Sequence, residues 1–220
     1  MNSNQYNRLL QVDWDLNIQA VFIKAWDLFK SQALLFVSFS LLIFSVAMLF
    51  VYYLQPYTIL FSVFLAPPLY AGFYLVANKI RRGEEVIYPD FFSGFQYGLL
   101  AIGISLFSQL VIGIGLVFLI LPGIYFLVAY LLAVPMGIFA GTNLWTSLEL
   151  SRVIVTRFWW KFFVLLILLI VYNGLGALLL GVGILITFPM TFLVIYVVFE
   201  ELTMEVLAGP DPSIIHEQES

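Results

Sequence analysis

The sequence predicts an all-α membrane protein with six transmembrane helices arranged as three hairpins, and three observations predict this fold class. Apolar residues make up 63% of the 220 residues and charged residues only 10%, against about 45–50% and about 25% in soluble domains. The apolar runs are continuous rather than alternating, which excludes a transmembrane β-barrel. The few charged residues divide the chain into long apolar intervals, each with turn residues near its middle.

Each of these intervals is long enough for two helices, because a single span needs about 20 residues. The intervals without a charged residue are 31–78, 91–148 and 162–199. Their turn residues are Gln55-Pro56, Pro122-Gly123 and Gly181-Val182-Gly183. The expected spans are therefore residues 33–54, 58–78, 99–121, 123–141, 162–180 and 183–199.

The spans form one predicted domain, residues 1–208, followed by a cytoplasmic tail of residues 209–220 whose sequence predicts flexibility. Residues 1–16 are polar, and the first apolar run begins only near Ala33. That run is too long for the apolar region of a secretory signal, and no small-residue cleavage site follows it. We expect the first helix to be retained.

The basic residues predict the orientation. Three hairpins place both termini and all segments between hairpins on the same side of the bilayer. All nine basic residues lie on that side: Arg8, Lys24, Lys30, Lys79, Arg81, Arg82, Arg152, Arg157 and Lys161. The positive-inside rule makes this side cytoplasmic. Both termini are therefore expected in the cytoplasm.

An amphipathic segment precedes each hairpin, beginning near Ile18, Pro89 and Thr146. Apolar faces that carry Trp beside basic residues suit a helix lying in the cytoplasmic interface. The same segments could instead be cytoplasmic extensions of the spans that pack on each other, and the sequence does not separate the two. Prolines in the second helix of each pair, Pro67-Pro68, Pro135 and Pro189, further suggest a threefold internal repeat.

Two amides, Gln109 and Asn173, are expected near the middle of spans. One interpretation is a path for a polar solute or a lipid headgroup. The other, which we favour, is hydrogen bonding between helices, worth about 0.6 kcal/mol on average.

A basic and aromatic patch lies before the fifth span, and it consists of Arg152, Arg157, Trp159, Trp160 and Lys161. It could hold anionic lipid headgroups or contact a partner. Anchoring the helix and setting its topology is the interpretation that we favour. Glu200, Glu201 and Glu205 follow the last span and could pair with these basic residues.

Catalytic motifs are missing from the sequence. The chain has no cysteine and a single histidine, His216 in the tail, so neither thiolate chemistry nor a histidine-based metal site or dyad is expected. No Walker loop occurs, and no carboxylate or basic side chain lies within a predicted span, as a proton relay would require. The basic residues are scattered, which disfavours nucleic acid as a partner. We predict no catalytic residue, no metal and no cofactor.

The second half of the chain resembles a known family. The segments LPGIYFLVAYLLAVP (121–135) and SLELSRVIVTRFWWKFF (147–163), followed by a glycine-rich hairpin, carry the likeness. The motifs are Pro122-Gly123-Ile124-Tyr125, Leu148-Glu149, Ser151-Arg152 and Trp159-Trp160. They resemble bacterial six-helix inner-membrane proteins of uncharacterised function, akin to the membrane domain of some glycerophosphoryl diester phosphodiesterases. The resemblance implies six helices in a bacterial inner membrane and no activity, since in those enzymes the chemistry belongs to a separate soluble domain.

Two functions are compatible with these observations. The first is a non-enzymatic membrane protein that organises protein partners or lipids from the cytoplasmic side. The alternative is a small transporter or channel for an apolar or zwitterionic solute or lipid, because helices interrupted by proline often line cavities. The expected partners are the lipid bilayer and a cytoplasmic or membrane protein.

Overall fold

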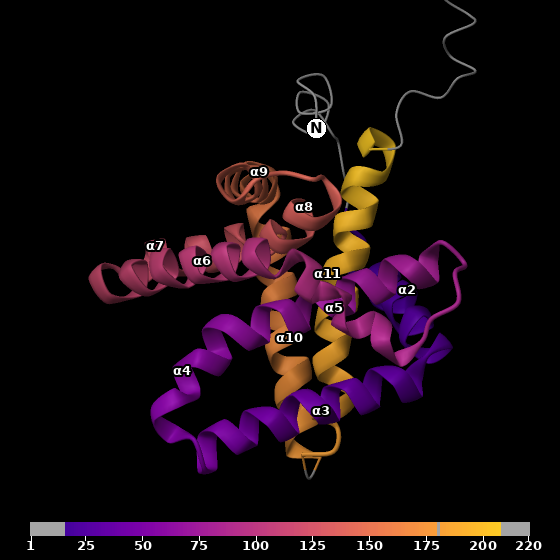
Figure 1. Ribbon diagram of the computed structural model, residues 1–220. Helices are drawn as coiled ribbons and strands as arrows, with labels where there is room; N and C mark the ends of the chain where they lie inside the picture. Colours follow the sequence, from indigo (N-terminus) through magenta and orange to yellow (C-terminus); the bar gives the residue numbers. More distant parts are fainter. Residues whose placement is uncertain (1–15, 180, 208–220) are drawn as a thin grey trace, which may run out of the picture.

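The computed structural model describes residues 16–179 and 181–207, and every regular element in these ranges is helical (Figure 1). The predicted tail at 209–220 and residue Arg8 lie outside the described residues. Six helical segments are long and apolar enough to cross a membrane: Ala33–Tyr52, Gln55–Arg81, Tyr88–Phe118, Ile120–Phe139, Trp159–Leu178 and Ile184–Thr203. The prediction of an all-α protein with six candidate spans is confirmed, and the chain has the character of a multi-pass membrane protein.

The elements follow one another with short connections, and some spans are built from several of them. They are α2 (Ile18–Ser31), α3 (Ala33–Tyr52), η1 (Gln55–Tyr57), α4 (Thr58–Leu60), η2 (Phe61–Leu65), α5 (Ala66–Arg81), η3 (Tyr88–Tyr97), α6 (Gly98–Phe118), α7 (Ile120–Ala129), α8 (Ala133–Phe139), α9 (Leu144–Arg157), α10 (Trp159–Leu178) and α11 (Ile184–Leu207).

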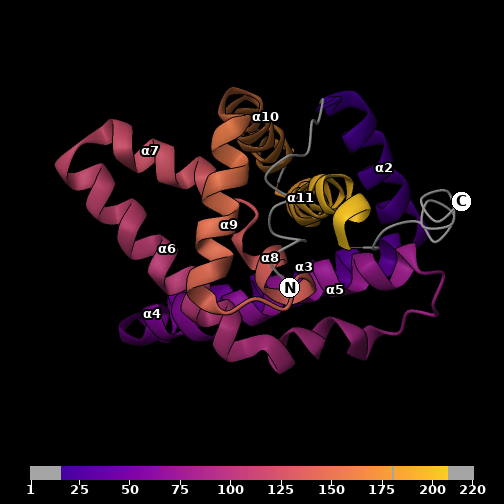
Figure 2. The ribbon, with the colours of Figure 1, turned by 90° about the horizontal axis from the view of Figure 1, so that it is seen from above.

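The helices do not form one parallel bundle. Helices α10 and α11 lie side by side and are seen nearly end-on in Figure 2, where α3, α6 and α7 are seen lengthwise. Helices α6 and α7 form an arm that extends away from α11 in both views (Figures 1 and 2). Helix α2 packs along α11. The consecutive helix pairs therefore point in different directions.

The second turn lies earlier than predicted. Leu119, with φ −152° and ψ 116°, adopts an extended conformation that separates α6 from α7. Pro122 then falls in the first turn of α7, where a missing backbone N–H costs nothing. Gly123 packs against Gly115 of α6, so closely that a Cβ on Gly115 would lie 2.9 Å from the Gly123 Cα. Pro122 and Gly123 thus serve the packing of the arm rather than its turn.

The three prolines differ in their places. Pro67 and Pro68 lie in the first turn of α5, directly after the π-helical segment η2. Pro135 lies near the start of α8, and Pro189 lies inside α11. The break before α8 is stabilised from α9, because the Ser151 hydroxyl accepts from the Leu132 N–H at 3.2 Å and donates to the Ala129 carbonyl at 2.7 Å. The threefold repeat stays a prediction.

All three segments predicted to precede the hairpins are helical, as α2, η3 and α9. The Asn17 side chain caps α2 by accepting from the Ala20 N–H at 3.0 Å, and Asn143 caps α9 in the same way. Part of the apolar side of α2 is buried within the protein, with Val21 and Ala25 fully covered, whereas Ile23 and Trp26 are exposed. The third segment, expected over residues 146–161, already ends at Arg157, because the chain breaks at Phe158 (φ −118°, ψ 28°) before α10 begins.

Aromatic rings fill the centre of the fold. Phe39 from α3, Phe73 from α5 and Phe91 from η3 are fully buried, with Phe39 and Phe91 4.5 Å apart between ring centroids. Phe192 of α11 stacks on Phe73 at 5.0 Å, which joins the last span to the first two. A side chain on Gly72 would collide with the Phe91 carbonyl group, so α5 and η3 touch at their backbones. This ring cluster is the core from which the remaining helices extend.

Candidate functional site

The predicted basic and aromatic patch is divided between two helices. Arg152 and Arg157 belong to α9, whereas Trp159, Trp160 and Lys161 belong to the start of α10. The Arg157 guanidinium and the Lys161 ammonium lie 5.6 Å and 5.8 Å from the centroid of the same ring, Phe158. The break at Phe158 therefore brings these two cations together around one aromatic residue.

Arg152 makes a different contact, within its own helix. Its Nη2 lies 2.6 Å from Glu149 Oε1 and its Nε lies 2.8 Å from Oε2, a two-point ion pair. The hydrogen bonds from Arg152 lower the pKa of the Glu149 carboxyl, and the same bonds raise the pKa of the guanidinium. This pairing leaves Arg152 less available to a lipid headgroup than the sequence suggests.

The two tryptophans differ in exposure. Trp160 is 72% exposed, as an interfacial anchor would be. Trp159 stacks on Phe163 at 5.0 Å, and its indole N–H is buried without a hydrogen-bond partner among the described residues. Only one of the two rings therefore projects outward.

The structure does not bring Gln109 and Asn173 together. The Asn173 side-chain amide donates to the Thr191 hydroxyl at 2.7 Å and to the Leu169 carbonyl at 2.9 Å, joining α10 to α11. For Asn173 this is a hydrogen bond between helices. Gln109 is exposed on α6, in the arm. The two amides do not line a common path.

Glu200 and Glu201, near the end of α11, pair with other bases than those of the α9 and α10 patch. Glu200 is buried, and its carboxylate accepts from Arg81 of α5 at 2.8 Å and 3.0 Å. Glu201 accepts from Lys24 of α2 at 2.7 Å. Of the bases that Glu200 and Glu201 could reach, the structure therefore gives them those of α5 and α2 rather than those of the α9 and α10 patch, because α11 ends beside α2 and α5. The side chain of Glu205 lies outside the described part.

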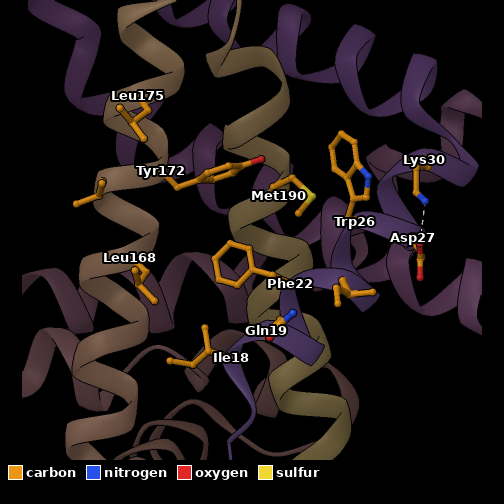
Figure 3. A pocket seen from close by; sticks show the side chains of 12 residues that line it. Ile18, Gln19, Phe22, Trp26, Asp27, Lys30, Leu168, Tyr172, Leu175 and Met190 are labelled. Carbon is orange, nitrogen blue, oxygen red and sulfur yellow. Dashed lines mark ion pairs between the residues drawn. The ribbon is translucent and has the colours of Figure 1, made fainter.

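An apolar groove lies between α2 and α10, with α11 beneath it (Figure 3). Its volume is about 900 Å³. Lining side chains are mostly aliphatic and aromatic: Ile18, Gln19, Phe22, Ile23, Trp26, Asp27, Lys30, Leu168, Val171, Tyr172, Leu175 and Met190. The Phe22 and Tyr172 rings meet edge to face across it at 6.0 Å. The groove is therefore an open apolar depression between the two helices, on the surface of the protein.

One end of this groove is charged. Asp27 and Lys30 form an ion pair of 2.9 Å, and both side chains are more than half exposed. Figure 3 shows this pair beyond Trp26, at the opposite end of α2 from Ile18. An apolar groove with one cation and one anion at its end suits an amphiphile. The groove was not predicted, because only the packing of both α2 and α10 against α11 creates it.

Comparisons with protein-family models, with curated proteins and with solved structures found no match. Within 16–179 and 181–207, no three histidine, cysteine or acidic side chains gather in a group that could hold a metal ion.

Proposed function

We propose that this chain is a non-enzymatic, multi-pass protein of a bacterial inner membrane that binds a zwitterionic phospholipid in the groove between α2 and α10. The groove itself is the observation that carries the proposal. Its volume of about 900 Å³ falls in the upper part of the range of about 300–1,000 Å³ typical of ligand sites. An acyl chain fits its apolar walls, and the headgroup lies at the charged end.

The charged end favours a headgroup with both signs of charge. In such a headgroup an ammonium faces Asp27 and a phosphate faces Lys30, in place of the ion pair between them. A purely anionic lipid would leave Asp27 beside a like charge. This complementarity selects a zwitterionic lipid over an anionic one.

The source of the ligand is the bilayer. Leu168, Val171 and Leu175 line the groove and belong to Trp159–Leu178, a helix apolar enough to cross a membrane. A groove along such a helix is reached by lipid. Transport, the alternative function, has less support, because Asn173 is already bonded to Thr191.

The proposal includes the membrane arrangement expected from the sequence: three helix pairs, surface segments before each pair, and both termini in the cytoplasm. The distribution of basic residues supports this orientation. The resemblance to the membrane domain of glycerophosphoryl diester phosphodiesterases supports a bacterial inner membrane. A protein partner at the cytoplasmic side remains part of the same proposal, with Trp160 and the cations at Phe158 as its contact.

The test is mass spectrometry of lipids retained by the purified full chain after mild detergent extraction. Val171→Trp fills the groove and is expected to reduce the retained zwitterionic phospholipid about tenfold. This corresponds to a loss of about 1.4 kcal/mol in the free energy of lipid binding. Ile170→Trp is the matched control, because Ile170 is 56% exposed and Val171 52%, yet only Val171 lines the groove. Equal retention by both variants would refute the proposal.

The headgroup assignment has its own test. Asp27→Asn removes the anion that the ammonium would face, so the variant is expected to lose its preference for zwitterionic over anionic lipid in vesicles of both. Lys30→Gln is expected to weaken retention of both classes. A preference unchanged in Asp27→Asn would contradict the assignment.

A further inference from the structure

Helix α6 has a side that no other part of the described chain covers. Gln109 is exposed on it, and its carboxamide makes no hydrogen bond within residues 16–179 and 181–207. One turn further, a Cβ on Gly113 would have no atom of the described residues within 4 Å. Leu110 and Val117 on the same side are 54% and 83% exposed. We name Gln109, Leu110, Gly113 and Val117 the α6 outer face.

The opposite side of α6 is packed. Ala101 and Ile104 are buried, and Gly115 touches the backbone of Gly123 in α7. Gly113 and Gly115 of α6 are thus used differently: Gly115 lies in a contact within the chain, whereas Gly113 leaves an open place on the outer face. Helix α6 thus has one side that packs against α7 and another side that no described residue covers.

The chemistry of the outer face identifies its occupant. Gln109 belongs to Tyr88–Phe118, a segment apolar enough to span a membrane, and lipid tails offer no hydrogen bond to its amide. A carboxamide has both donors and an acceptor, so it is complementary to a second carboxamide. A two-fold axis places the same patch of two copies face to face. Gly113 permits close approach of the two backbones there.

We propose that the protein self-associates through this surface, with α6 of one copy packed against α6 of a second copy. The Gln109 amides of the two copies donate to each other across the axis. Gly113 lies where the two α6 backbones come closest, and Leu110 and Val117 pack around it. This interface is independent of the lipid groove, which lies on α2 and α10.

Site-specific cross-linking tests the proposal, because the chain has no cysteine of its own. A single Leu110→Cys variant is reconstituted in vesicles at a high lipid-to-protein ratio and oxidised. It is expected to give a disulfide-linked dimer. Ile170→Cys is the matched control, since Ile170 on α10 is 56% exposed and Leu110 is 54% exposed. Equal dimer from both variants would indicate random collision and overturn the proposal.

Two further substitutions test the contacts. In fluorescence energy transfer between labelled copies, Gln109→Leu is expected to weaken association about fivefold and Gly113→Leu about tenfold or more. Gly174→Leu is the control for added bulk, because the Cβ of Gly174 also meets open space but lies on α10. Association unchanged in Gln109→Leu and Gly113→Leu, or equally reduced in Gly174→Leu, would overturn the proposal. The proposal would also be overturned if Leu110→Cys, oxidised in native membranes, formed a cross-link to a different protein and none to a second copy.

Discussion

Two regions of the molecule are apolar enough for a membrane but differ in how many of their residues are buried. One is the pair of helices α5 and α11, and the other is the arm of α6 and α7. In the last span, Ile184–Thr203, 61% of the residues in the most apolar window are buried inside the protein. In Tyr88–Phe118, which contains α6, the fraction is 11%. The first region is tied by the Arg81–Glu200 ion pair and by stacked rings. The outer part of the arm is tied by glycine contacts between α6 and α7.

This difference shows that an apolar composition does not say where a helix finds its contacts. Helix α11 finds them inside the chain, through Phe192 and Glu200. Few residues of helix α6 are fully buried, so its surroundings supply contacts that the chain does not. Substitutions in the first region are therefore expected to change stability, whereas those on the α6 outer face are expected to change association.

The largest effect is expected from the buried ion pair. Arg81→Met leaves the Glu200 carboxylate, whose side chain is 8% exposed, without its cation. We expect a loss of about 3 kcal/mol in the free energy of unfolding, near the low end for a broken buried pair. The measurement is reversible unfolding in mixed micelles with a rising fraction of SDS.

The matched variant Glu200→Gln removes the other partner. It is expected to cost clearly less, because the Arg81 side chain is 38% exposed and reaches solvent. If the two variants unfolded at the same SDS fraction, burial of Glu200 would not be the source of the effect.

A smaller effect is expected where α5 and η3 touch. Gly72→Ala places a methyl group against the Phe91 carbonyl, a backbone atom that cannot turn aside. We expect a loss of about 2 kcal/mol, within the range for overpacked sites, in the same unfolding assay. Gly174→Ala serves as the control, because its new methyl group meets open space. A Gly72→Ala protein as stable as Gly174→Ala would mean that η3 moves away freely.

The smallest effect concerns the exposed pair of Glu149 and Arg152. Because Arg152 lowers the pKa of Glu149 below its ordinary value of 4.5, the pair stabilises the fold above that pH. The contribution is lost as the pH falls through the lowered pKa. Glu149→Gln is therefore expected to cost about 0.2–0.5 kcal/mol at pH 7 and nothing in strong acid. A constant difference at both pH values would exclude the ion pair as its cause.

The number of spans and the helical character could be predicted from the sequence, because composition and the charge-free intervals depend only on local residues. The position of the second turn could not. Pro122 and Gly123 are ordinary turn residues, but Gly123 is needed for contact with Gly115, so the extended residue is Leu119. The break at Phe158 was missed for a similar reason, since the apolar pattern continues through it.

The candidate site shows the same limit. Asn173 could be singled out from the sequence, since an amide within a span needs a partner, but its partner Thr191 could not. The groove was missed, because Trp26 and Val171 are far apart in the sequence and only the packing of α2 and α10 against α11 brings them to the same groove. The partner of Glu200 was also missed. Several bases lie on the same predicted side, and the sequence does not say that α5 ends beside α11.

The ring cluster of Phe39, Phe73, Phe91 and Phe192 has a consequence for the temperature dependence of this fold. In a water-soluble protein, separating such rings exposes them to water and raises the heat capacity by about 0.45 cal/mol/K for each Å² of apolar surface. These rings lie in segments apolar enough to cross a membrane, so their separation exposes them to acyl chains instead. The free energy of helix separation is therefore expected to vary almost linearly with temperature, without the curvature that leads soluble proteins to cold denaturation.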